Sequence, residues 1–400
     1  MAGIAALAIG YVLSQFYRSF LAVLTPVLTT ELGMTKVDLS VASGAWFALF
    51  ALAQFAVGVW LDRFGPRRTA SIMLALFGGA GAILFAIASA PWMIVAGMAL
   101  IGLGCSPILM SALFIYARNH SPARFAVLAS WTIAFGTAGN VIGAAPLAEA
   151  AQIFGWRTAM GALGIFTILT AAAIAIFLRD PPKPEGAVHA ATGLSGYREL
   201  FSIRRLWPII PITALNYAPT TGIRGLWSGP YLADVYGADS IVIGEVAMFM
   251  ALAMVAGSFL YGPLDQLFRT RKWVAVAGNA VTVLALITLA LNPAAGLATT
   301  TLLFIAIGLA GGSYGVLMAH ARAFVPAHLT GRGVTMMNFF SIGGVGMMQF
   351  ATGGVVTAWS APGDPTSGYV ALFCFYALAV GLALLVYLSS RDARPEAARS

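Results

Sequence analysis

Two arginines, Arg18 and Arg224, each lie in the interior of a long apolar stretch of the sequence. A charged side chain in the middle of a membrane span costs at least about 2.5–3.5 kcal/mol on insertion scales, so such residues usually serve a function. A guanidinium presents a planar fork of N–H donors that matches a carboxylate or a phosphate group. The two arginines therefore predict a clamp for an organic anion.

A structural role would require each arginine to pair with a buried acid. The chain has 14 acidic residues, and none is predicted clearly at mid-depth of an apolar stretch. Glu245, about one helical turn inside its stretch, and Glu149, near the outer end of another, come closest. An anionic substrate is then the simplest counter-charge, although a structural role for one or both arginines stays open.

Polar and aromatic residues recur around both arginines at helical spacing. Tyr11, Gln15 and Arg18 are spaced i, i+4 and i+7 and so share one face of a helix. A similar stripe runs from Tyr217 to Tyr231, although packing in the core is the alternative for any single aromatic residue. The residues predicted to bind substrate are Arg18, Arg224, Tyr11, Gln15, Tyr17, Tyr217, Thr220, Trp227, Tyr231, Asn140, Tyr314 and Asn338.

The composition determines which kind of protein positions these residues. Hydrophobic residues make up 60% of the 400 and charged residues 9%, whereas a soluble domain has roughly 25% charged residues. The mean hydropathy is +0.88, so the outer surface must face lipid. This excludes a cytosolic enzyme, a nucleic-acid-binding protein and a disulfide-stabilised secreted domain. No catalytic, metal-binding or nucleotide-binding motif is evident, so we expect neither an enzyme nor a cofactor.

Segments of about 20 apolar residues can cross a bilayer as helices, and the sequence predicts an all-α membrane protein with twelve of them. The predicted spans are 4–30, 40–61, 69–90, 93–117, 125–148, 157–178, 206–234, 241–263, 273–291, 296–321, 333–358 and 368–389. One long polar stretch separates the first six from the last six. We therefore predict a six-helix half (1–178), a cytoplasmic linker (179–205), a second six-helix half (206–390) and a cytoplasmic tail (391–400).

The basic residues predict the orientation of the chain. Of 22 lysines and arginines, Arg18 and Arg224 fall within spans, and Lys36 and Arg157 fall in loops on one side. The remaining 18 fall in the tail and the loops on the other side, which the positive-inside rule assigns to the cytoplasm. We expect a multi-pass protein of a bacterial-type cytoplasmic (inner) membrane with both termini in the cytoplasm.

The two halves repeat one another in sequence. Gly58 and Gly262 begin similar loops and lie 204 positions apart. The same shift of 204 relates Arg118 to Arg322, and Arg18 and Arg224 are separated by 206 positions. A single shift with a small gap predicts two pseudo-symmetric halves around an axis along the membrane normal.

The loop at residues 58–68 reads Gly-Val-Trp-Leu-Asp-Arg-Phe-Gly-Pro-Arg-Arg. It resembles the signature of the major facilitator superfamily between its second and third spans, and a degenerate copy follows at 262–272. The resemblance covers the whole chain and implies the major facilitator fold, with transport by alternating access and ligand binding between the halves. It also implies a gating role for Gly58, Asp62, Arg63, Gly65, Arg67, Arg68 and Asp265.

Within that superfamily, the first half is similar to the anion:cation symporter branch, in the spacing of Glu31, Asp38 and the signature loop. Arginines on the first and seventh spans are also the pattern of organophosphate:phosphate antiporters. Both resemblances imply a small organic anion as substrate, with a monomeric carrier in the bilayer. Proton symport and anion antiport both stay open, because Tyr17 stands where many symporters have an acid tied to proton coupling.

Two acidic residues could carry a coupling proton in place of the missing acid, namely Glu245 and Glu149. The four histidines offer no coupling group, because all are predicted to be solvated in cytoplasmic loops or at helix ends: His120, His189, His320 and His328.

Two alternative functions use other residues. Met250 and Met254 are spaced i, i+4 and could pass Cu(I) between thioethers, although methionine is also common as core filler. The aromatic residues could instead serve a carrier of amphiphiles or drugs. A receptor or assembly factor that transports nothing is a third alternative, and it predicts no flux of any substrate in liposomes.

Overall fold

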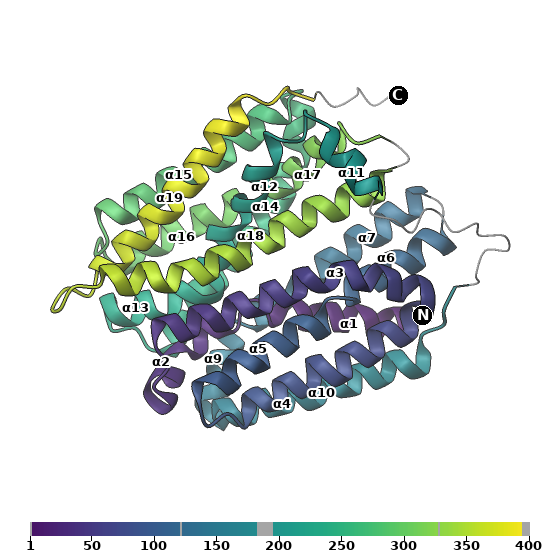
Figure 1. The fold of residues 1–400 in the computed structure, drawn as a ribbon. Coiled ribbons are helices and arrows are strands. Elements are labelled where there is room, and N and C mark those ends of the chain that lie inside the picture. Colours follow the sequence, from purple (N-terminus) through teal and green to yellow (C-terminus); the bar gives the residue numbers. More distant parts are fainter. Residues whose placement is uncertain (1, 121, 182–194, 327–328, 394–400) are drawn as a thin grey trace.

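A computed structural model describes residues 2–120, 122–181, 195–326 and 329–393, and these are almost entirely helical (Figure 1). The first part contains α1 (Ala2–Phe16), α2 (Leu21–Leu32), α3 (Lys36–Met73), the π-helix η1 (Leu74–Gly79), α4 (Ala80–Ala86), α5 (Pro91–Cys105), α6 (Ile108–Asn119), α7 (Pro122–Gly136), α8 (Ala138–Ile142), α9 (Ala145–Phe154) and α10 (Trp156–Phe177). The second part contains α11 (Ser195–Ser202), α12 (Ile209–Gly222), the π-helix η2 (Ile223–Trp227), α13 (Ser228–Tyr236), α14 (Ser240–Leu267), α15 (Lys272–Leu291), α16 (Leu297–Gly311), α17 (Ser313–Arg322), α18 (Thr330–Trp359) and α19 (Ser367–Leu388).

Eight helical stretches of the described chain are long and apolar enough to cross a membrane, and nine if the bent pair α1 and α2 forms one span. The stretch Lys36–Ala86 has 51 residues, about 75 Å at 1.5 Å per residue, more than twice a bilayer core of about 30 Å. This stretch contains two predicted spans. They are separated at Gly65, whose φ of 81° breaks the helix, and at Pro66, which follows it. The fifth and seventh predicted spans are each divided into short helices, which explains the lower count.

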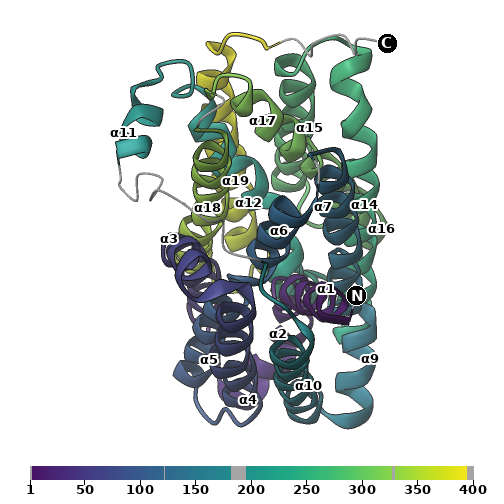
Figure 2. The ribbon, with the colours of Figure 1, turned by 90° about the vertical axis from the view of Figure 1, so that its right-hand side faces the viewer.

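Figures 1 and 2 both place α3, α4 and α5 in one half of the molecule and α15, α18 and α19 in the other. Helices before α11 contact mainly one another, and so do those after it. The predicted linker contains α11, while its residues 182–194 lie outside the described chain, as do residues 394–400 of the predicted tail.

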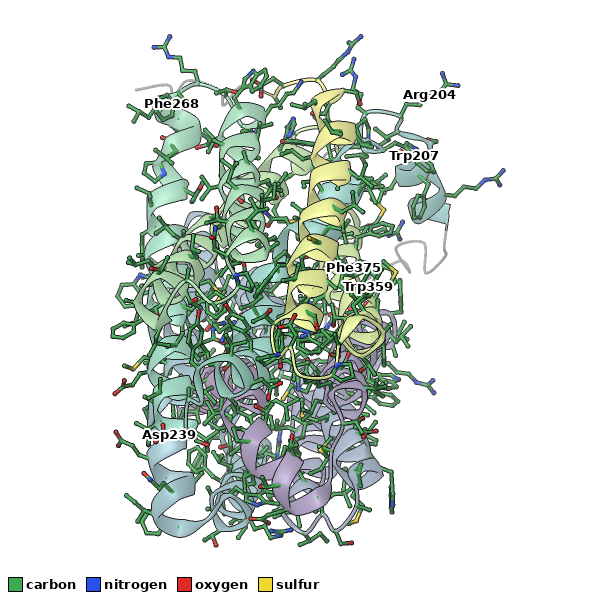
Figure 3. All side chains as sticks on the ribbon, turned by 90° about the vertical axis from the view of Figure 1, so that its left-hand side faces the viewer. Arg204, Trp207, Asp239, Phe268, Trp359 and Phe375 are labelled. Atoms are coloured by element: carbon green, nitrogen blue, oxygen red, sulfur yellow. The ribbon has the colours of Figure 1, made fainter. Side chains whose placement is uncertain are left out.

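The surface of the bundle is apolar. Large hydrophobic side chains such as Leu76, Phe259 and Leu291 are exposed, and Figure 3 shows Trp207 and Phe268 projecting outward. Serine, threonine, asparagine and glutamine side chains are instead found buried between helices. This distribution is the reverse of a soluble protein and matches a lipid environment.

The halves touch at one end of the bundle, which contains Lys36, Asp234 and the loop of residues 360–366. We name it the outer end, because the positive-inside rule predicts it outside the cytoplasm. In Figure 1 the halves converge at the left, near α2 and α13, and their helices diverge toward the right. The Lys36 Nζ lies 2.7 Å from Asp234 Oδ2, an ion pair between the halves.

Glycines allow this close contact. A Cβ atom on Gly353 of α18 would lie 2.5 Å from the Ser40 Cβ of α3, and one on Gly229 of α13 would lie 2.1 Å from the Ala22 carbonyl oxygen of α2. Real Cβ atoms almost never come so near to another atom. The Ser40 hydroxyl donates to the Gln349 carbonyl and accepts the Gly353 N–H at 2.9 Å. Contacts of α3 with α18, of α2 with α13, and of α14 with α2 and α9 therefore join the halves.

Candidate functional site

Both buried arginines lie where a helix is interrupted. Arg18 is in the turn of residues 17–20 between α1 and α2, whose axes differ by 53°. Arg224 is in the π-helix η2, which widens the turn between α12 and α13. π-helical turns and kinks are often found at functional sites. A Cβ atom on Gly225 would lie 2.7 Å from the Arg18 carbonyl oxygen, so the two interruptions meet at the contact between the halves.

The Arg224 side chain is 1% exposed, and its Nε, Nη1 and Nη2 are buried without a hydrogen-bond partner among the described residues. The buried Nε of Arg18 has no such partner either. The Arg18 guanidinium carbon lies 5.2 Å from the centre of the Trp46 ring and 4.7 Å from that of Phe50. An unpaired buried charge costs several kcal/mol. The described protein thus leaves positive charge at this point without a carboxylate.

The acidic residues that the structure describes are exposed or paired away from the two arginines. Glu245 and Glu149 are exposed, and neither is among the groups that interact with Arg224, so the structure does not bring the two coupling candidates to this arginine. Four other acids form ion pairs with basic residues other than Arg18 and Arg224: Asp62 with Arg118, Asp265 with Arg271, Asp234 with Lys36, and Glu31 with Arg157.

Five of the residues predicted to bind substrate gather near the arginines: Tyr11, Gln15, Tyr217, Tyr314 and Asn338. The Gln15 amide donates to the Tyr11 hydroxyl at 2.8 Å. The Tyr217 and Tyr314 ring centres are 5.5 Å apart, and the Tyr314 hydroxyl donates to Asn338 Oδ1 at 3.2 Å. Arg18 is close enough to interact electrostatically with Tyr11, Tyr314 and Arg224. These groups, from both halves, form what we call the arginine site.

Two residues beside the arginines point away from this site. The Tyr17 hydroxyl lies 2.9 Å from Thr167 Oγ1 in α10, inside the first half. The Thr220 hydroxyl donates to the Ile307 carbonyl at 3.1 Å, inside the second half. Asn140 is buried in α8, where no described residue donates to its Oδ1, and its neighbour Gly139 packs against α1.

The aromatic residues after Arg224 also bond elsewhere. Trp227 Nε1 donates to Thr352 Oγ1 at 3.0 Å, and the Tyr231 hydroxyl donates to the Pro293 carbonyl at 2.6 Å. The expected single stripe from Tyr217 to Tyr231 therefore does not form. A π-helical turn holds more residues than an α-helical turn, so η2 rotates every later side chain away from a 3.6-residue pattern.

Two residues of the arginine site were missed from the sequence. Trp46 and Phe50 of α3 are stacked, with ring centres 5.1 Å apart and planes at 15°, and they lie against the Arg18 guanidinium. Their i, i+4 spacing was the available signal, but aromatic pairs in an apolar helix usually indicate core packing. Trp46 Nε1 is also buried without an acceptor among the described residues.

The signature loop is held within the first half. A Cβ atom on Gly65 would lie 2.7 Å from the Asp180 carboxyl carbon, and Asp180 Oδ1 accepts the Arg67 N–H at 2.8 Å. Asp62 Oδ1 lies 3.8 Å from Arg118 Nη2. A pocket of about 280 Å³ is formed by the loop and its neighbours, including Arg63, Arg68 and Pro181. Gly58 has open space around it.

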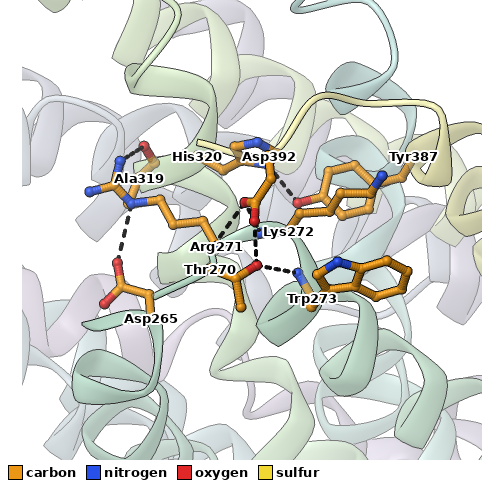
Figure 4. A network of polar contacts seen from close by, with 9 residues as sticks. All are labelled: Asp265, Thr270, Arg271, Lys272, Trp273, Ala319, His320, Tyr387 and Asp392. Carbon is orange, nitrogen blue, oxygen red and sulfur yellow. Dashed lines mark hydrogen bonds and ion pairs between the residues drawn. The ribbon is translucent and has the colours of Figure 1, made fainter. Parts of the chain in front are cut away.

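The equivalent loop of the second half is held in a similar way (Figure 4). Asp392 accepts from the Thr270 hydroxyl at 2.5 Å and from the Lys272 N–H at 3.0 Å. Although burial raises the pKa of the Asp392 carboxyl, these hydrogen bonds outweigh burial and hold its pKa below the usual value. Asp265 pairs with Arg271 at 3.2 Å. Asp180 directly follows Arg179, and Asp392 directly follows Arg391. This repeated Arg-Asp pair was not predicted from the sequence.

The prediction that His320 is solvated is wrong. His320 is fully buried, with Nδ1 2.6 Å from the Tyr387 hydroxyl and Nε2 2.9 Å from the Arg391 carbonyl oxygen. It joins α17 to the end of α19, an arrangement that a position near a helix end does not reveal. His189 and His328 lie outside the described residues.

The methionine pair shows packing contacts. Met250 is fully buried in α14, and a Cβ atom on Gly308 of α16 would lie 3.2 Å from its Cγ. Met254 is partly buried. The described residues contain no group of three or more His, Cys, Asp or Glu side chains that could hold a metal ion. The contacts of Met250 are those of a side chain that fills the α14–α16 interface.

Solved structures resemble the whole bundle. A bacterial homologue of the human lysosomal transporter Spinster, in an inward-facing and occupied conformation, matches 97% of this chain and 96% of its own with a TM-score of 0.79 and 18% identity. A D-xylose-proton symporter matches 97% of each chain with a TM-score of 0.77 and 12% identity. At sequence identities this low, the two structural matches show the fold alone. They confirm the predicted major facilitator architecture.

Sequence comparison gives the family. The sequence model described as Major Facilitator Superfamily matches residues 7–223. The "Probable sulfoacetate transporter SauU" of Cupriavidus necator is 24% identical over 263 residues, which are 62% of this chain and 60% of the relative. The match thus spans less than two thirds of that relative's length. Because the family match covers more than half of the chain, and the fold agrees, this multi-pass membrane protein belongs to the major facilitator superfamily of transporters and is not an enzyme.

Proposed function

We propose that this secondary transporter moves a small organic anion, and that Arg18 and Arg224 bind the anion between the two halves. The observation that carries the proposal is the Arg224 side chain, whose three guanidinium nitrogens are buried without a partner among the described residues. Such a group is stable only if something else supplies the opposite charge. An anion bound from water during each transport cycle would do so.

The position of the arginines supports a transport role over a purely structural one. The two arginines come from different halves, and the backbone of Gly225, next to Arg224, lies against the backbone of Arg18. A ligand that contacts both halves stabilises the conformations in which the halves close around it. Ligand binding is thereby coupled to alternating access. An arginine needed only for packing within one half would gain nothing from this position.

The relative named as a sulfoacetate transporter supports the anion class. Sulfoacetate carries a sulfonate and a carboxylate, and two guanidiniums can neutralise one such dianion. We therefore place small carboxylates, organophosphates and carboxylated sulfonates together as the candidate substrates. We further propose that the protein works in a cytoplasmic-type membrane, with both termini in the cytoplasm.

Uptake into proteoliposomes tests the proposal. We expect uptake of a carboxylate, an organophosphate or sulfoacetate by the wild type, and a loss of at least about 100-fold in Arg18→Gln and Arg224→Gln, since each removes a charged hydrogen-bond donor. Arg204→Gln is the matched control, because Arg204 is an exposed arginine that projects outward (Figure 3). Full uptake by both site variants would contradict the assignment.

A further inference from the structure

Trp46 adds an unsatisfied donor to the arginine site. Its indole N–H can only donate, it is fully buried, and no described residue accepts from it. Buried donors without acceptors are rare in folded proteins because each costs about 1–3 kcal/mol. The indole ring lies beside the Arg18 guanidinium, at 5.2 Å from ring centre to guanidinium carbon.

The position of the Trp46 ring is fixed from several sides. Phe50 stacks on it at 5.1 Å, and Phe47 packs against its edge at 4.8 Å. Its backbone is held against α5, since a Cβ atom on Gly102 would lie 2.2 Å from the Trp46 carbonyl oxygen. The indole N–H is thus preorganised and does not depend on a flexible side chain for its aim.

The contrast with Trp227 shows that this is a feature of the site and not of tryptophan in this bundle. Trp227 is equally buried, but its indole N–H donates to Thr352 Oγ1 at 3.0 Å. Three unsatisfied nitrogen donor groups thus lie at or beside Arg18: its own Nε in the turn between α1 and α2, Trp46 Nε1 in α3, and the Arg224 guanidinium in η2.

We propose that Trp46 is a substrate-binding residue, and that its N–H and the two guanidiniums together recognise a tetrahedral head group with three terminal oxygens, such as a sulfonate. This inference rests on the proposed function and specifies its substrate class. A carboxylate has two oxygens in one plane, which two guanidinium forks can already saturate. The Trp46 N–H is a further donor, on another element. It therefore favours a head group that has a third oxygen outside that plane.

Sulfoacetate and malonate are the matched probes, since they differ by one sulfonate in place of one carboxylate. Titration calorimetry on the purified wild type should give tighter binding of sulfoacetate. Trp46→Phe keeps an aromatic ring beside Arg18 but removes the N–H together with part of the indole ring, and the loss of ring volume should affect both probes alike. We therefore expect the sulfoacetate Kd to rise about tenfold or more and the malonate Kd to change less than threefold. Trp227→Phe is the matched control and should leave the ratio of the two Kd values unchanged.

The possible outcomes separate the two proposals. Equal or tighter binding of malonate by the wild type overturns the tetrahedral assignment without any variant. An unchanged sulfoacetate Kd in Trp46→Phe, or an equal loss for both probes, overturns the role of Trp46 even if Arg224→Gln abolishes binding and so supports the anion site. If the wild type binds no anion at all, the proposed function fails and this inference fails with it.

Discussion

Arg224 illustrates how function can conflict with stability at a single residue. Burial removes the water that would hydrate the guanidinium, and no described residue accepts a hydrogen bond from its three nitrogens instead. The ligand-free protein therefore carries a destabilising group that a packed apolar side chain would avoid. Arg18 is better compensated, because its guanidinium lies against the faces of Trp46 and Phe50, which favour a cation.

Tyr17 and Tyr11 should respond differently to loss of a hydroxyl. Tyr17→Phe removes the contact with Thr167 inside the first half. We expect a loss of about 1 kcal/mol in stability with an unchanged KM for the anion. Tyr11→Phe should raise KM, because Tyr11 lies at the arginine site. Thermal unfolding and uptake kinetics measure both effects, and a raised KM in Tyr17→Phe would return Tyr17 to the set of substrate-binding residues.

The two arginines of the site could be predicted from the sequence, because charged residues are rare in apolar spans. Two arginines in apolar spans are uncommon, and the structure brings them to one point with Tyr11, Gln15 and Tyr217. Trp46 could not be predicted in this way, because a buried tryptophan with a free N–H has the same sequence pattern as one with a bonded N–H. Trp227 was predicted in the site from its helical spacing with Arg224, yet its indole N–H donates to Thr352.

At the scale of elements, hydropathy predicted the spans but not their interruptions. The first, fifth and seventh predicted spans are all divided in the structure, and two of these divisions are the ones that hold Arg18 and Arg224. Hydropathy averages over a span and is insensitive to which turn is π-helical. The side-chain directions after η2 therefore required coordinates, whereas the existence of an apolar crossing segment did not.

Gly353 and Gly343 on α18 offer a matched test of the seam between the halves. Gly353→Ala places a Cβ atom 2.5 Å from Ser40 on α3, while a Cβ on Gly343 meets nothing within 4 Å. We expect Gly353→Ala to hinder closure of the outer end and to lower the uptake rate at least about tenfold. Gly343→Ala should keep the rate and gain up to about 1 kcal/mol of stability from helix propensity. Equal rates in the two variants would show that this seam does not limit transport.

The whole molecule is two similar halves, and the structure extends the repeat beyond the sequence landmarks. Asp180 and Asp392 follow the last helix of their halves and accept the backbone N–H groups of Arg67 and of Arg271 and Lys272, respectively. Carboxylates at helix starts are favoured by the helix dipole. Each half thus fixes its own loop internally, and this leaves the outer seams and the arginine site as contacts between halves.

The thermal unfolding of purified wild type and Arg224→Met, each with and without sulfoacetate, tests the central claim most directly. We predict that the variant unfolds at a higher temperature than the ligand-free wild type, by about 1–4 kcal/mol in stability, and that sulfoacetate stabilises only the wild type. A variant that is less stable than the wild type, together with a wild type that does not respond to sulfoacetate, malonate or an organophosphate, would contradict the account and make Arg224 a structural residue.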